Sequence, residues 1–157
     1  PAAALDLVSR LADATGLRGL ASGQSLDLRT GEAEASFDRL ETIHARKTGA
    51  LFVAAAEFGA VLGGARAKEL AAVRSYAKNV GLAFQIVDDL LEKEDPSRTG
   101  KQARRAAAPT FVRRVGEDGA RRLVGELTLH AVEALEPFGA RARLLREFAS
   151  LLRDRSA

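Results

Sequence analysis

The stretch VGLAFQIVDDLLE, residues 80–92, combines an apolar helix with a row of acidic side chains. Its apolar residues point in every direction around a helix, which is typical of a helix buried on all sides. Its polar residues recur at i, i+3, i+4 and i+7 and therefore share one face: Gln85, Asp88, Asp89 and Glu92. Like charges on adjacent turns repel, by about 4 kcal/mol for a pair ~4 Å apart at an effective dielectric of ~20. Buried carboxylates in such a row need protons, a cationic partner or a metal ion.

Two interpretations of this acidic stripe stay open on the residues alone. The first is a solvated face near a helix end, where carboxylates are ordinarily found. The second is a magnesium site that lines a helical cavity. An all-oxygen cluster suits a hard cation, and Mg²⁺ fills its remaining positions with water and substrate phosphate.

A second polar cluster lies in IHARKTGAL, residues 43–51. Lys47 and Thr48 come where Gly49 is expected to loosen a helix, and an ammonium next to a hydroxyl suits a phosphate ligand. His44 lies three residues before Lys47, on the same face of a helix. The alternatives are an ordinary surface lysine and a packed structural histidine.

Two further segments carry weaker signals. In GQSLDL, residues 23–28, Gln24 and Asp27 lie one turn apart, a spacing that is equally typical of the polar surface of a short helix. In TGK, residues 99–101, a glycine lets the loop backbone approach a ligand and Lys101 follows. The longer phosphate-loop pattern is absent there.

Around these segments the sequence predicts an all-α fold, because alanine and leucine dominate and β-branched runs are short. The expected helices cover residues 2–15, 18–28, 36–62, 67–93, 110–115, 117–135 and 140–155. Ser36 is expected to cap the third helix, and residues 94–109 form the longest irregular stretch. The first helix carries an apolar face made of Leu5, Val8, Leu11 and Ala12. Neither an internal repeat nor a change in composition marks a second domain.

Composition excludes several classes of protein. The 157 residues are 46% hydrophobic, a length typical of one domain. Cysteine is absent, which excludes a disulfide scaffold, a thiolate metal site and a cysteine nucleophile, and favours a reducing, cytoplasmic location. No apolar run is long enough to span a bilayer, and no signal-peptide pattern opens the chain. A net charge of +3 with one tyrosine and no tryptophan argues against a nucleic-acid partner.

Four segments, taken in order, resemble the C-terminal half of a trans-isoprenyl diphosphate synthase: GLRGLASGQSLDL, LETIHARKTGAL, SYAKNVGLAFQIVDDLLE and TGK. This is the polyprenyl synthetase family, which includes farnesyl and geranylgeranyl diphosphate synthases. The resemblance runs from about Gly16 to Phe111. It implies an all-α bundle around a central cavity and, as a rule, a homodimer. It also implies a Mg²⁺-dependent condensation of an allylic diphosphate with isopentenyl diphosphate.

The resemblance further assigns roles to individual residues. Asp88 matches a direct Mg²⁺ ligand, and Asp89 and Glu92 match residues that act on the metal through water. Three residues match positions that contact the allylic diphosphate: Lys47, Thr48 and Lys101. Gln85 matches a polar position beside it that faces the cavity. Phe84 and Gln24 match positions that line the substrate pocket. Lys47, Thr48 and Asp88 are the positions expected to be catalytic.

The chain also departs from the family pattern. Glu92 stands where aspartate is more common, and the segment after Lys101, GKQARRAAAPTF, lacks a glycine–aspartate pair and a further lysine. The first aspartate-rich motif is missing, so residues 1–157 are expected to be the C-terminal part of one domain and to be inactive alone.

Two other functions fit the same scaffold. A non-catalytic partner or regulatory subunit would be free to lose Lys47, Thr48 and Asp88, all of which are present. A terpene cyclase of related fold is disfavoured because the lysine–threonine motif and GQSLDL resemble the chain-elongating group. Product chain length and the preferred allylic substrate are not fixed by these residues.

Overall fold

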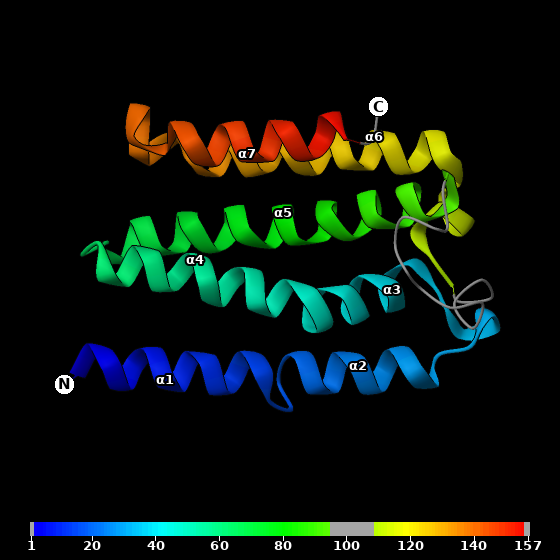
Figure 1. The fold of residues 1–157 in the computed structure, drawn as a ribbon, viewed down its shortest axis with the longest axis horizontal. Coiled ribbons are helices and arrows are strands. Elements are labelled where there is room, and N and C mark those ends of the chain that lie inside the picture. Colours follow the sequence, from blue (N-terminus) through cyan, green and yellow to red (C-terminus); the bar gives the residue numbers. More distant parts are fainter. Residues whose placement is uncertain (1, 95–108, 156–157) are drawn as a thin grey trace.

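The computed structural model of the chain describes residues 2–94 and 109–155, and helices account for its regular structure in those two ranges (Figure 1). Within these ranges seven α-helices follow one another, and some of the connections between them are 3₁₀ or π turns. In chain order the elements are α1 (Ala2–Thr15), α2 (Leu20–Arg29), the 3₁₀ turn η1 (Glu32–Glu34), α3 (Phe37–His44), the π turn η2 (Ala45–Gly49), α4 (Ala50–Leu62), α5 (Ala67–Glu94), α6 (Phe111–Ala134), the 3₁₀ turn η5 (Glu136–Ala142) and α7 (Arg143–Asp154). The predicted all-α class is confirmed.

The helices form three layers, and α5 lies in the middle one (Figure 1). Helices α1 and α2 run end to end along one side, α3, η2 and α4 continue one another beside α5, and α6 and α7 cover the opposite side. Helix α5 supplies a large share of the buried apolar core: Tyr76, Ala77, Val80, Ala83, Ile86, Val87 and Leu90. Burial of the helix that carries the acidic stripe agrees with its apolar sequence.

Several predicted boundaries coincide with the observed ones because local chemistry sets them. The Ser36 side chain accepts the backbone N–H of Arg39 at 3.2 Å and caps α3. Helix α4 ends at Gly63, which precedes Gly64 with φ of +72°. Gly116, at φ of +73° and ψ of 170°, has a non-helical backbone and forms the expected break between two helical parts of α6.

The long helix predicted over residues 36–62 is continuous but changes its winding at the expected weak point. Five residues, Ala45–Gly49, form the π turn η2 between α3 and α4. Gly49 also lies against α5, where a Cβ placed on Gly81 would come 3.2 Å from the Gly49 Cα. Two glycines therefore allow η2 and α5 to approach closely.

The first helix is oriented differently from what its apolar face suggests. Leu5 and Val8 are 71% and 65% exposed. Helix α1 packs on α4, and Arg10 Nη1 donates to Glu57 Oε2 at 2.7 Å across this contact. Arg10 thereby supplies a cationic partner to Glu57, which is a buried carboxylate.

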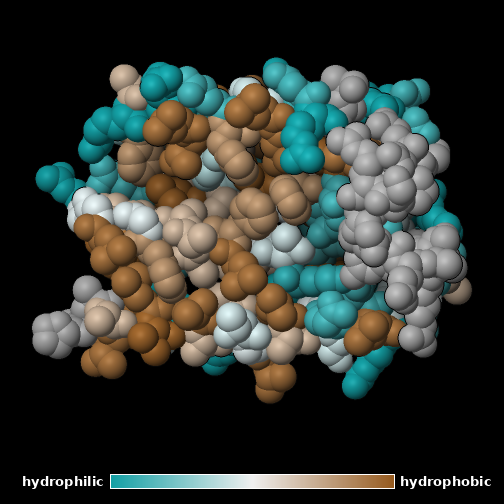
Figure 2. Space-filling view, in the orientation of Figure 1, coloured by the Kyte–Doolittle hydropathy of each residue, from teal (hydrophilic) through white to brown (hydrophobic). Residues whose placement is uncertain are grey.

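One face of the molecule is broadly hydrophobic. Figure 2 shows apolar residues across the middle and lower left of this view, with hydrophilic residues gathered along its upper edge. In the part of the chain that the structure describes, no helix is both long and apolar enough to cross a membrane.

Candidate diphosphate-binding site

The π turn η2 lies directly against α2, and a glycine makes this possible. A Cβ on Gly23 would overlap the backbone nitrogen of Lys47 and lie 2.7 Å from its Cα. One turn further along α2, Asp27 Oδ2 accepts a hydrogen bond from Lys47 Nζ at 2.5 Å. Both side chains are partly buried, so this ion pair is shielded from solvent more than a surface pair.

The same turn reaches α5 through its threonine. Thr48 Oγ1 donates to Gln85 Oε1 at 3.0 Å. The structure thus brings Lys47, Thr48 and Gln85 together, as the sequence predicts. It adds Asp27, to which the sequence assigned no role although the spacing in GQSLDL singled it out.

His44, the last residue of α3, lies at the centre of this group. It is 8% exposed, and its ring packs on that of Phe111 with centroids 5.3 Å apart. The pKa of His44 is lowered to about 4, chiefly by burial and also by the charge of Lys47, while Asp27, Gln85 and Asp88 act in the opposite direction. The imidazole is therefore neutral at physiological pH.

The three carboxylates of the acidic stripe have different environments. Asp89 is buried, and its Oδ2 accepts the backbone N–H of Phe111, the first residue of α6, at 3.4 Å. This contact suits a helix N-terminus, where a negative charge is stabilising. Asp88 and Glu92 are partly buried on the same helix. Among residues 2–94 and 109–155, no three acidic or histidine side chains converge into a complete metal-binding group.

The two residues predicted to line the substrate pocket, Phe84 and Gln24, lie on α5 and α2, and both of these helices contact η2. The Phe84 ring packs on that of Phe52 from α4, with centroids 5.4 Å apart. Gln24 is partly buried on α2, next to Gly23. Lys101, predicted to contact the diphosphate, lies outside the described residues.

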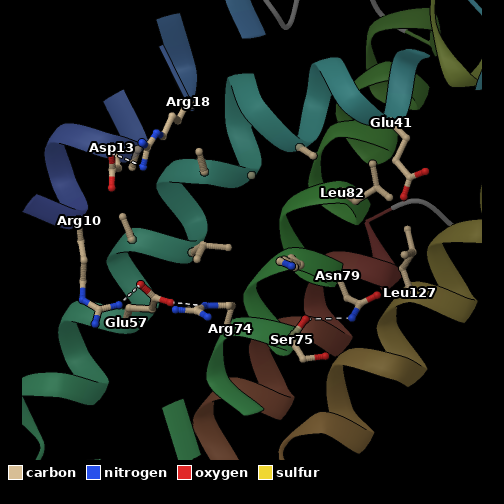
Figure 3. A pocket seen from close by; sticks show the side chains of 18 residues that line it. Arg10, Asp13, Arg18, Glu41, Glu57, Arg74, Ser75, Asn79, Leu82 and Leu127 are labelled. Atoms are coloured by element: carbon tan, nitrogen blue, oxygen red, sulfur yellow. Dashed lines mark hydrogen bonds and ion pairs between the residues drawn. The ribbon is translucent and has the colours of Figure 1, made fainter. Parts of the chain in front are cut away.

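A pocket of about 750 Å³ lies between α1, α4 and α5, apart from the predicted residues. None of the predicted site residues is among those that line it, although Gly49 and Ala45 of η2 are. Figure 3 shows Glu57 at one end of it, between Arg10 and Arg74. Because this buried carboxylate has two guanidinium partners, we interpret the cluster as a link between three helices.

The group around η2 can bind an anion together with a hard cation. Lys47 offers positive charge, and Thr48 and Gln85 offer neutral hydrogen-bond donors. Carboxylates of the kind that Mg²⁺ prefers stand beside them on α2 and α5. A cation-bound phosphate or diphosphate group has both kinds of partner within this arrangement.

Comparisons with known proteins agree on one family. The sequence model described as Polyprenyl synthetase matches residues 2–139. Geranylgeranyl pyrophosphate synthase 11, chloroplastic, from Arabidopsis thaliana is 38% identical over 138 residues, which cover 83% of this chain and 39% of that protein.

Solved structures give the same result. An FPP/GFPP synthase from Zymomonas mobilis superposes with a TM-score of 0.83 at 31% identity, over 97% of this chain and 51% of that one. A geranyltransferase from Helicobacter pylori, solved with magnesium and isoprenyl diphosphate, gives a TM-score of 0.76 at 25% identity, over 96% of this chain and 50% of that one. The chain thus spans about half the length of these structures.

Proposed function

This chain belongs to the polyprenyl synthetase family, and we propose on that basis that the complete protein is a prenyltransferase. It joins an allylic diphosphate to isopentenyl diphosphate and releases inorganic diphosphate. The carbon–oxygen bond of the allylic diphosphate breaks and the diphosphate leaves with the electron pair. The double bond of isopentenyl diphosphate attacks the resulting cation, and a proton is then lost.

The observation that carries this proposal is the convergence of Lys47, Thr48 and Gln85 at the contact between η2 and α5. The departing diphosphate gains negative charge, and donors fixed beforehand stabilise that charge without reorganising. Lys47 is held by Asp27 through one N–H. Its ammonium group has two further donors for diphosphate oxygens.

Magnesium is the cofactor that we propose, held by Asp88 directly and by Asp89 and Glu92 through water. The donor set fits: Asp88 and Glu92 are partly buried carboxylates one turn apart on α5, and Asp27 lies on α2, which packs against η2 as α5 does. Because no three of the described carboxylates or histidines form a complete group, the remaining ligands are expected from the diphosphate and from water. When bound, the metal would neutralise charge on the leaving diphosphate.

An apolar wall beside the donors suits the hydrocarbon part of the substrate. Phe84 and Phe52 pack against each other on α5 and α4, and Gln24 of α2 is proposed to line the same pocket. Aromatic rings attract a nearby cation through their π faces. Lys101 is a further proposed diphosphate contact.

The remaining features of this proposal concern the complete protein. We propose that residues 1–157 form the C-terminal part of a single all-α domain, which the half-length match to the solved structures supports. The homodimer stays a prediction. The cytoplasmic location also stays a prediction, since several relatives are named as chloroplastic.

A condensation assay tests the proposed function. The complete protein is incubated with labelled isopentenyl diphosphate and allylic diphosphates of several lengths, with and without Mg²⁺. A longer polyprenyl diphosphate that forms only with Mg²⁺ is the expected product. No condensation with any allylic substrate would favour a non-catalytic subunit, and a cyclic hydrocarbon formed from the allylic diphosphate alone would favour a terpene cyclase.

A further inference from the structure

His44 is a polar side chain at the centre of the site with no completed hydrogen bond. It is more than nine-tenths buried, yet neither ring nitrogen meets hydrogen-bond geometry with any partner in the described structure. Burying an unpaired polar group costs free energy that an apolar side chain of the same shape would avoid. The imidazole can therefore form a hydrogen bond in another state of the site, such as the state with a ligand bound.

The surroundings of His44 restrict where that capacity can be used. One side of the ring is occupied by Phe111, which also packs edge-on against Phe37 with centroids 5.2 Å apart. Thr48, four residues after His44, donates to Gln85 of α5 at 3.0 Å, and this bond brings the Gln85 carboxamide close to the imidazole. Gln85 is also among the groups that raise the pKa of His44.

Gln85 needs a further hydrogen-bond partner because its carboxamide has an acceptor oxygen at one end and N–H donors at the other. Its Oε1 accepts the Thr48 hydroxyl, and a carbonyl oxygen can accept a second donor. If the Thr48 hydroxyl turns to donate to a bound diphosphate, this bond is lost and the carboxamide is free to rotate. A rotated carboxamide would present its oxygen to the anion, which is repulsive, instead of its N–H donors.

We propose that His44 is a positioning residue that donates a ring N–H to Gln85 Oε1 and so keeps the Gln85 amide N–H groups directed at the diphosphate. This inference rests on the proposed function and assigns a residue that acts through Gln85 without touching the substrate.

The direct test is a spectroscopic one on the complete protein, with magnesium pyrophosphate as the probe. The chain has two histidines, and His130 lies exposed on α6 as an internal reference. Addition of the probe is expected to shift the ¹⁵N resonance of the protonated ring nitrogen of His44 and to leave those of His130 unchanged. A bound probe that leaves the His44 nitrogens unaltered would overturn the inference.

Binding of the same probe to variants gives a second test. His44→Phe keeps a planar ring against Phe111 but removes the donor, and it should weaken binding about five- to tenfold, the loss that one hydrogen bond of ~1 to 1.4 kcal/mol represents. His44→Asn keeps a side-chain N–H and should recover part of that loss. In a Gln85→Ala background, His44→Phe should have no further effect. His130→Phe is the matched control and should bind as the wild type does.

The outcomes separate this inference from the function on which it rests. If Lys47→Ala weakens binding and His44→Phe does not, or if the His44 and Gln85 variants are additive, His44 is not a positioning residue and the diphosphate site stands. If the wild type does not bind the probe, or if Lys47→Ala binds it equally well, the diphosphate site itself is wrong.

Discussion

Gly23 of α2 lies so close to Lys47 of η2 that a Cβ on the glycine would overlap the lysine backbone. This contact seats the π turn on α2 and places Asp27 beside the Lys47 ammonium. The position of the predicted phosphate-binding lysine therefore depends on a residue that has no side chain.

Gly23→Ala is expected to destabilise the protein by at least about 2 kcal/mol, because the added Cβ would clash with the Lys47 backbone, which cannot move aside. Gly125, inside α6, has nothing within 4 Å of an added Cβ and is the matched control. Gly125→Ala should be neutral or stabilise by up to ~1 kcal/mol. Urea denaturation of both variants measures the difference, and equal stabilities would contradict the close approach of α2 and η2.

Lys47→Ala should weaken binding of the allylic diphosphate about 10- to 100-fold, the effect of one charge-assisted hydrogen bond of ~1.5 to 3 kcal/mol. Binding of isopentenyl diphosphate should change less. Arg46→Ala in the same turn removes an exposed cation and should leave both affinities nearly unchanged. Titration calorimetry with each substrate provides the measurement. Equal losses for the two substrates would place Lys47 outside the allylic site.

Asp88→Ala should lower the rate of condensation at least about 100-fold, since a metal that stabilises the leaving group contributes several kcal/mol. The thermal unfolding transition should be retained. Chelation of Mg²⁺ should abolish turnover of the wild type, and added Mg²⁺ should restore it. Asp118→Ala, at an exposed position on α6, serves as the control. A near-wild-type rate for Asp88→Ala would remove this residue from the metal site.

Glu57→Ala should destabilise the protein by about 2 to 3 kcal/mol, because Glu57 is buried and binds Arg10 and Arg74 from two other helices. The two arginines are partly exposed and can regain water, which limits the loss. Glu147→Ala breaks an exposed i,i+4 pair with Arg143 and should cost less than about 0.5 kcal/mol. Chemical denaturation distinguishes them, and a loss for Glu57→Ala as small as that for Glu147→Ala would mean that the three-helix link adds nothing.

The stability of the protein should fall as the pH is lowered below the ordinary pKa of histidine. The pKa of His44 is about 4 in the folded state against 6.5 in the unfolded chain, so the unfolded state takes up the proton first. The stability is complete above the unfolded value and is lost as the pH falls towards the folded one.

Between about pH 7.5 and about pH 4.5 the His44 contribution to this loss should be ~2 to 3 kcal/mol. His44→Phe should lack that part of the pH dependence, whereas the carboxylates contribute equally to both proteins. Urea denaturation of the wild type and the variant at both pH values measures it. Parallel pH dependences would show that His44 is not buried in its neutral form.

Much of the fold follows from short-range chemistry and was predictable for that reason. The cap at Ser36, the end of α4 at Gly63 and the all-round apolar pattern of α5 depend on neighbours within a few residues. The π turn η2 could not be predicted from the sequence, because a glycine that weakens a helix can kink it, end it or expand it into a π turn.

Residue types and their spacing were enough to predict the candidate site residues: a lysine–threonine pair, a glutamine and three carboxylates at helical spacing. How these residues meet depends on contacts between helices that are distant in the sequence. The Lys47–Asp27, Thr48–Gln85 and Arg10–Glu57 contacts join residues 20, 37 and 47 positions apart. The tertiary structure also decided that α1 turns its arginine, not its leucines, towards α4. Helical periodicity predicts which residues share a face. Which face is buried depends on the free energy of packing each face against the other helices.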